Sequence, residues 1–285
     1  MSFVIEDVLV RDDPAGERLP LVFDSPHSGT RYPADFGFVC PLATLRQAED
    51  TYVDELFAAA PEHGATLLSA LFPRSYIDLN RSLEDLEPEL VDGAWPWPLK
   101  PSDKSAAGMG LIRRLCRPGM PMYDAKLSVA RVTERIERYY RPYHEQLAGT
   151  IDALYRRFGT VFHLNCHSMP SFVPPGGREP ADFVLGDRDG TTCEPAFTRF
   201  VRSVLEDLGY RVRINDPYKG VELVRRYCNP AAGIHSLQVE ISRRLYMHEE
   251  TLEKHAGFDT LREDVAILVA ALAEHCRITP AEAAE

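Results

Sequence analysis

The sequence lacks the patterns that mark several large classes of protein. Its 285 residues hold no apolar run long enough to cross a bilayer, so we expect no membrane association. The formal net charge is −11, from 32 basic and 43 acidic residues, and no basic stripe predicts a nucleic-acid partner. The first residues show no basic region followed by an apolar core, so we also expect no signal peptide.

Cysteine is scarce and scattered. No two cysteines form a CxxC pair, which argues against a thiolate zinc site and against a disulfide framework. We therefore expect reduced thiols and a cytoplasmic protein. The six residues are Cys40, Cys116, Cys166, Cys193, Cys228 and Cys276.

The chain also has no internal repeat and no low-complexity block. Its length fits one domain spanning residues 1–285, and its hydrophobic content of 45% is enough for a sizeable core. Short apolar runs alternate with amphipathic helical stretches through most of the chain. This alternation predicts an α/β fold with a mixed, mostly parallel sheet flanked by helices.

The predicted elements follow from hydrophobic periodicity and from turn residues. Strands or extended segments are expected at 19–23, 65–71, 76–81, 161–167, 182–187, 210–214 and 234–241. Helices are expected at 42–63, 128–158, 194–208 and 250–275, with a kink at Pro142. Residues 168–180 are rich in proline and glycine and are expected to form a loop. The tail at 281–285 is expected to fray. Residues 82–107 combine prolines with both tryptophans, which is typical of a lid or binding loop, a surface excursion being the alternative.

Polar residues recur where the predicted strands end. His27 lies in a turn-rich stretch directly after the first strand, and His167 ends the strand at 161–167. Ligands of open α/β sheets bind at the carboxyl ends of strands, and a neutral imidazole is a good ligand for zinc. Two such histidines therefore predict one metal site. A histidine that only hydrogen-bonds a tight turn is the alternative at His27.

An acidic residue is expected to complete that site. The chain contains no HxxE or HExxH pattern, so spacing alone does not identify the acid. Asp24, Asp50 and Asp54 are the candidates. Asp50 and Asp54 lie four residues apart and would share one face of the predicted helix, although acids on a helix more often form a solvated face.

Glu240 is the candidate general base. Its apolar neighbours Val239 and Ile241 predict a raised pKa, which suits a carboxylate that takes a proton from water. A salt bridge from Glu240 to Arg243 or Arg244 is the competing interpretation.

Four further residues can bind the carboxylates of a substrate. Asn80 offers an amide, and Arg81 offers a guanidinium that can polarise a carbonyl or bind a carboxylate, unless it pairs with Asp78 instead. Lys219 and Arg225 are additional candidates, although the position of each favours an ordinary surface charge. His163 shares a strand face with His167 and fits a hydrogen-bonded core histidine or an outer neighbour of the site.

Four segments, taken in order, resemble the N-formylglutamate amidohydrolase family over residues 18–270. They are Ser25-Pro26-His27-Ser28-Gly29, Ile77-Asp78-Leu79-Asn80-Arg81, Asn165-Cys166-His167-Ser168-Met169-Pro170, and Gln238-Val239-Glu240-Ile241 with Leu245-Tyr246-Met247. The segment Asn215-Asp216-Pro217-Tyr218-Lys219-Gly220 fits as well. The resemblance implies a zinc-dependent amide hydrolase with a fold similar to zinc carboxypeptidases, which releases formate and L-glutamate in histidine degradation.

The resemblance also implies roles for particular residues. His27 and His167 fall on the metal-binding histidines, while Thr30 stands where a carboxypeptidase-like enzyme has its ligating glutamate. Asp50 is the expected third ligand, and Asp54 is the alternative. Asn80 and Arg81 resemble the pair that binds a substrate carboxylate, and Glu240 resembles the general base.

Three functions remain open at this point. The first is zinc-dependent hydrolysis of N-formyl-L-glutamate, and the second is hydrolysis of another N-acyl amino acid or of a peptide-like amide. The third is a non-catalytic binder of small acidic ligands. The sequence predicts a small-molecule partner, and leaves open whether the chain forms a homo-oligomer and which divalent ion it carries.

Overall fold

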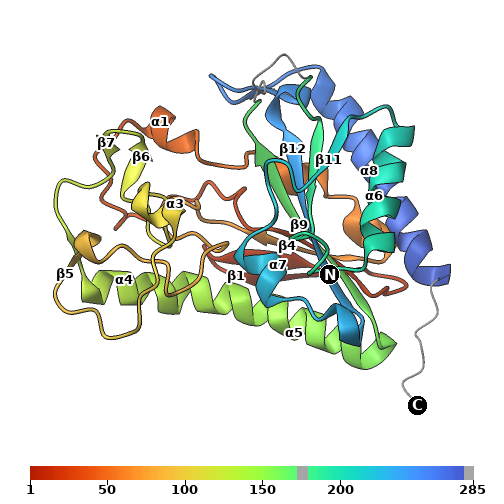
Figure 1. Ribbon diagram of the computed structural model, residues 1–285, viewed down its shortest axis with the longest axis horizontal. Coiled ribbons are helices and arrows are strands. Elements are labelled where there is room, and N and C mark those ends of the chain that lie inside the picture. The colour runs from red at the N-terminus through yellow and green to blue at the C-terminus, as the bar shows by residue number, and fades with distance from the viewer. Residues whose placement is uncertain (172–178, 279–285) are drawn as a thin grey trace.

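The computed structural model describes residues 1–171 and 179–278, and Figure 1 shows how their helices surround a central sheet. Within these residues an eight-stranded sheet has the order β1-β2-β4-β3-β9-β12-β10-β11. The strands are β1 Ser2–Ile5, β2 Leu9–Asp12, β3 Leu21–Ser25, β4 Thr66–Ala70, β9 Val161–Met169, β10 Phe183–Gly186, β11 Val212–Ile214 and β12 Ile234–Ser242.

The sheet is mixed, with a parallel centre. β3 runs parallel to both β4 and β9, β9 runs parallel to β12, and β10 runs parallel to β11. The pairs β1–β2, β2–β4 and β10–β12 are antiparallel. The predicted fold class is therefore confirmed, while the N-terminal hairpin of β1 and β2 was not predicted.

Helices cover both faces of the sheet. α4 (Val129–Arg135) and α5 (Arg141–Phe158) form one long rod on one side, and α6 (Pro195–Asp207) and α8 (Gly257–Ile278) lie on the other (Figure 1). The kink predicted at Pro142 takes the form of a π-helical turn, Ile136–Tyr140, which leads into α5. Such a turn accommodates a proline because the ring has no N–H to donate to the preceding turn. None of the helices in the described part of the chain is long and apolar enough to span a membrane.

The alternation of side chains along β9 separates an apolar face from a polar one. Phe162, Leu164 and Cys166 join the core that α6 and α8 cover. The intervening residues His163, Asn165 and His167 point the opposite way, toward α5. This polar row leads along the strand toward the carboxyl end, where the candidate site lies.

The prediction of a single helix at 42–63 is wrong. The structure has α1 (Leu42–Arg46), α2 (Val53–Leu56) and a 3₁₀ turn (Ala60–His63), with a break at residues 47–52. In that break the Arg243 guanidinium donates to the carbonyl oxygens of Gln47 (3.0 Å) and Glu49 (2.6 Å). The Asp50 N–H donates to the carbonyl oxygen of His27 at 3.0 Å. These distant partners satisfy backbone groups that a continuous helix would have paired internally.

Two other predicted elements differ from the structure. Residues 76–81 form turns and not a strand, because the Asp78 carboxylate accepts the N–H of Asn80 at 2.9 Å and its carbonyl accepts the N–H of Arg81 at 3.2 Å. The last helix begins at Gly257 and not at residue 250, because β13 (Met247–His248) and β14 (Glu253–Lys254) pair with each other first.

Residues 82–127 form a mostly irregular excursion from the sheet. It contains the 3₁₀ turn Pro88–Leu90, β5 (Val91–Asp92), α3 (Asp103–Ala106), β6 (Leu115–Arg117) and β7 (Met120–Pro121), and β5 pairs with β8 (Leu127–Ser128). A further short helix, α7 (Glu222–Arg226), precedes β12. A lid role for 82–107 stays a prediction. Most of the loop predicted at 168–180, and the tail at 281–285, lie outside the described residues.

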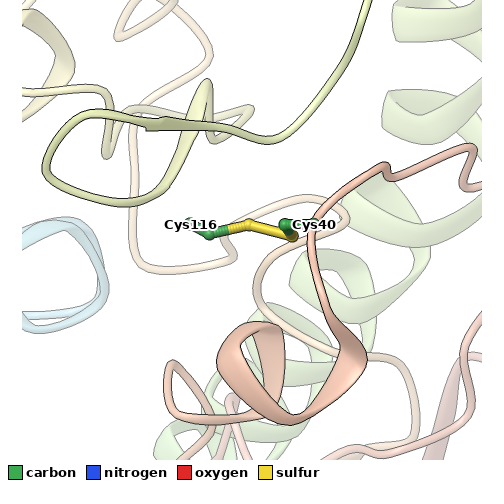
Figure 2. Close-up of a disulfide and its surroundings, with 2 residues drawn as sticks. All are labelled: Cys40 and Cys116. Atoms are coloured by element: carbon green, nitrogen blue, oxygen red, sulfur yellow. A yellow bond between two sulfur atoms is a disulfide. The ribbon is translucent and has the colours of Figure 1, made fainter.

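The expectation of reduced thiols is wrong for one pair of cysteines. Cys40 and Cys116 form a disulfide that joins the chain just before α1 to β6 (Figure 2). The two residues are 76 positions apart, so their spacing gave no sign of the pairing. Of the residues described, Cys166, Cys193, Cys228 and Cys276 are free thiols, in keeping with the expectation.

Candidate functional site

Three sequence-predicted residues meet beyond the carboxyl end of β3. His27 comes from the turn after β3, Asp50 from the break between α1 and α2, and His167 from the end of β9, and all three are buried. The Nδ1 atoms of the two histidines are 3.1 Å apart. The Asp50 Oδ2 atom lies 3.3 Å from the Nδ1 of His27 and 2.8 Å from that of His167. Asp54 does not belong to this group, so Asp50 is the acid that the fold brings to the histidines.

The hydrogen bond on the far side of His27 sets its protonation. Its Nε2 atom lies 2.8 Å from the Asp78 Oδ1 atom. Burial acts to raise the pKa of Asp78, but the charge of Arg74 and the hydrogen bond from His27 hold it well below its ordinary value. Asp78 is therefore a carboxylate that accepts the Nε2–H of His27. We assign the tautomer with a free electron pair on Nδ1, directed at the group.

His167 carries the same tautomer for a different reason. Its Nε2 atom lies 2.7 Å from the Oδ1 atom of Asn165, and the Asn165 amide donates from Nδ2 to the Asp24 Oδ1 atom at 2.8 Å. The bond to Asp24 fixes the orientation of the amide, so its oxygen must accept a hydrogen bond from the Nε2–H of His167. The free electron pair of His167 is then on Nδ1, as in His27.

Asp24 is the centre of a buried hydrogen-bond network behind His167. Its carboxylate also accepts from the Nε2–H of His163 and the hydroxyl of Tyr143, both at 2.8 Å. The Nδ1 atom of His163 lies 2.7 Å from the Ser236 hydroxyl. His163 is thus a hydrogen-bonded core histidine, one of the two interpretations of the sequence, and it also supports the residues that orient His167.

The far oxygen of Asp50 is held by polar groups. Its Oδ1 atom lies 3.3 Å from Arg243, 3.7 Å from Arg74 and 3.5 Å from the Ser168 hydroxyl. Burial acts to raise the pKa of Asp50, but its neighbours His167, His27 and Arg74 hold it well below the ordinary value. Asp50 therefore presents an ionised oxygen to the group.

The chemistry of these three atoms fits a divalent metal ion. Two imidazole electron pairs and one carboxylate oxygen converge, and three acceptors repel one another unless a cation lies between them. Two histidine nitrogens and one carboxylate are also the protein ligands of many catalytic zinc sites, which keep a fourth position open. The hydrogen bonds from the outer nitrogens to Asp78 and Asn165 are the support that ligating histidines normally have.

Glu240 lies beside this group, on the neighbouring strand. It stands opposite His167 in the β9–β12 register, and its Oε1 atom accepts a hydrogen bond of 2.8 Å from Gln238. Burial raises the pKa of Glu240 to about 7. The competing salt bridge is absent among the described residues, because Arg243 turns toward residues 47–50 and Arg244 pairs with Asp182.

The predicted substrate binders divide into two pairs. Asn80 lies in the site, with its Nδ2 atom 3.1 Å from the Nε2 of His167, and Arg81 follows it. The structure does not bring Lys219 or Arg225 to this group. Lys219 is exposed and pairs with Asp189, and Arg225 is exposed and pairs with Glu222.

Sequence reasoning missed two arginines. Arg74 donates to Asp78 from Nε (3.2 Å) and Nη2 (2.9 Å), which explains why Asp78 does not pair with Arg81. Its position four residues before Asp78 was the available signal. Arg113 lies in the irregular excursion, where neither periodicity nor a motif pointed to it.

The fold and the site together define an α/β protein with a candidate metal centre at the carboxyl ends of its parallel strands. The family model for N-formylglutamate amidohydrolase matches residues 19–247. Two relatives called N-formylglutamate deformylase match over more than four fifths of both chains. The one from Pseudomonas putida is 30% identical and covers 81% of this chain and 83% of its own, and the one from Pseudomonas aeruginosa is 33% identical and covers 82% and 84%.

A solved structure agrees with these matches. The N-formylglutamate amidohydrolase from Ralstonia eutropha JMP134 is 51% identical, with a TM-score of 0.92 over 95% of this chain and 99% of its own. The chain belongs to the N-formylglutamate amidohydrolase family.

Proposed function

We propose that this protein hydrolyses N-formyl-L-glutamate to formate and L-glutamate with the help of one zinc ion. One observation carries the proposal. In a member of the N-formylglutamate amidohydrolase family, two imidazole electron pairs and one ionised carboxylate converge within 4.8 Å. Family membership supports the substrate, and the donor set of His27, Asp50 and His167 supports the metal. Through the same family resemblance we assign the reaction to histidine degradation.

The metal would be held by the Nδ1 atoms of His27 and His167 and by a carboxylate oxygen of Asp50. Bound there, zinc would polarise the formyl carbonyl and lower the pKa of a water molecule. The remaining chemistry belongs to side chains of the protein.

Glu240 acts as the general base. It takes a proton from the attacking water and delivers it to the amide nitrogen as the C–N bond breaks, so that formate and the free amine of glutamate leave. Its pKa of about 7 suits both steps, because the carboxylate accepts a proton readily and also returns it near neutral pH.

Asn80 and Arg81 hold the α-carboxylate of the substrate. Asn80 contacts His167, and the Arg81 side chain has no hydrogen bond in the described structure, its nearest acidic oxygen being on Asp85 at 3.8 Å. A guanidinium in this state is available to bind a carboxylate.

Formate release provides the test. Purified protein should release formate from N-formyl-L-glutamate, lose this activity after chelation and dialysis, and regain it on addition of one equivalent of Zn²⁺. An N-acetyl-L-glutamate control separates a deformylase from a general deacylase. Full activity in protein shown to be free of metal would contradict the proposal.

A further inference from the structure

Arg113 is a buried cation without a partner. Its relative exposure is 9%, and within the described residues its guanidinium has no hydrogen bond and no ion pair. The Nε atom is fully covered and unsatisfied. Burying an unpaired charge is costly, and native proteins seldom retain one that has no function. The residues that the structure describes supply no partner for this charge, so it is free to bind an anion that enters from solvent.

The position of Arg113 places that anion beside the candidate metal centre. The Asp78 N–H donates to the carbonyl oxygen of Leu111 at 2.8 Å, so the segment that carries Arg113 runs next to Asp78. Burial, followed by the charge of Arg74, lowers the pKa of Arg113 to about 10, which leaves it charged at neutral pH. The charge of Asp78 opposes this lowering of the pKa.

A pocket of about 360 Å³ opens at Arg113. Gln47 and Ala48 form one wall, and they immediately precede the stretch that holds Asp50. Cys116, Arg117 and Glu250 also contribute to the lining. The pocket gives an anion from solvent access to Arg113.

We propose that Arg113 binds the side-chain carboxylate of N-formyl-L-glutamate and thereby selects N-formyl derivatives of acidic amino acids. This assignment rests on the proposed function. The substrate has two carboxylates, and Arg81 and Arg113 are two guanidinium groups without hydrogen bonds next to the site. Arg81 takes the α-carboxylate, since its neighbour Asn80 contacts His167 and the α-carbon is attached to the scissile nitrogen.

The other cations considered for the substrate carboxylates are already paired. Arg74 bonds to Asp78, Lys219 pairs with Asp189, and Arg225 pairs with Glu222. Arg113 is therefore the residue that can recognise the second carboxylate without breaking an existing ion pair.

Selectivity between two substrates tests the assignment. We would compare Arg113→Met, Arg113→Lys and the control Arg114→Met on N-formyl-L-glutamate and on its neutral isostere N-formyl-L-glutamine. Arg114 is the next residue in the chain, but it pairs with Glu87. Arg113→Met should lower kcat/KM about 100-fold or more for the glutamate derivative, mainly through KM, and less than about threefold for the glutamine derivative. Arg113→Lys should restore part of the selectivity, and Arg114→Met should leave it unchanged.

Stability distinguishes recognition from a structural role. Because Arg113→Met removes an unpaired buried charge, its melting temperature should equal or exceed that of the unaltered protein. Equal losses on both substrates together with a lower melting temperature would overturn the assignment, and so would an unchanged selectivity ratio.

Binding of glutarate, measured by calorimetry, separates this inference from the proposed function. If the unaltered protein releases formate from neither substrate, the proposed function fails, and glutarate still decides the role of Arg113. Loss of glutarate binding in Arg113→Met supports the role, and unchanged binding overturns it.

Discussion

Replacing Asn165 with leucine should weaken metal binding without touching a ligand. Asn165 is buried, and its oxygen accepts the Nε2–H of His167 at 2.7 Å. Without that acceptor, the nearest polar group to Nε2 is the amide nitrogen of Asn80, a donor at 3.1 Å, since the Asn80 oxygen is occupied by the N–H of Leu223. A donor facing Nε2 favours the tautomer with its proton on Nδ1, the atom that must bind the metal.

The expected loss follows from the cost of removing such support. Substituting the hydrogen-bond partner of a ligating histidine typically lowers metal affinity about 10- to 100-fold, or about 1.4–2.7 kcal/mol. Asp24 loses one donor but keeps His163 and Tyr143, so we expect folding to be weakened by about 1–3 kcal/mol and not abolished.

A competition titration with a chromophoric chelator would measure the affinity for Zn²⁺, and urea unfolding would measure stability in parallel. Ser236→Ala is the matched control, because it removes a buried hydrogen bond at the far end of the same network and leaves Asn165 and Asp24 in place. The control should bind zinc as the unaltered protein does. If Asn165→Leu bound zinc within twofold of the unaltered protein, the tautomer argument would be refuted.

Two further predictions concern catalysis and pH. Glu240→Gln should lower kcat about 10²- to 10⁴-fold while zinc content stays at one equivalent, and unchanged turnover would favour a non-catalytic binder. Burial lowers the pKa of His144 from 6.5 to about 3, so the unfolded chain binds a proton there that the folded protein does not. Stability should therefore fall as the pH drops below about 6.5, by about 2 kcal/mol at pH 5 from this residue alone. Urea unfolding at pH 7 and pH 5 measures this loss of stability. Between the two pH values His144→Gln should lose about 2 kcal/mol less than the unaltered protein, and equal losses would contradict the prediction.

The sequence predicted the site where local signals sufficed. His27 and His167 both end apolar strands, and parallel strands bring their carboxyl ends to one edge, so their meeting followed from topology. Glu240 was predicted to lie with them because its strand ends at the same edge, and the register places it directly opposite His167. Asp50 was chosen through the family resemblance, and the structure brings it to the histidines.

Long-range contacts account for what the sequence did not predict. The break that carries Asp50 to the histidines is held by Arg243, which lies 193 positions away in the chain, so helical periodicity at 42–63 was misleading. The disulfide between Cys40 and Cys116 likewise joins segments that no local pattern connects. Arg113 lies in an irregular segment, and only its burial without a partner distinguishes it from a surface charge.

The most direct test of the metal centre is anomalous scattering from a crystal of the zinc-loaded protein, recorded on both sides of the zinc absorption edge. We predict one peak at about 2.0–2.2 Å from the Nδ1 atoms of His27 and His167 and from a carboxylate oxygen of Asp50. No peak among these three residues, or a peak with different ligands, would contradict the account.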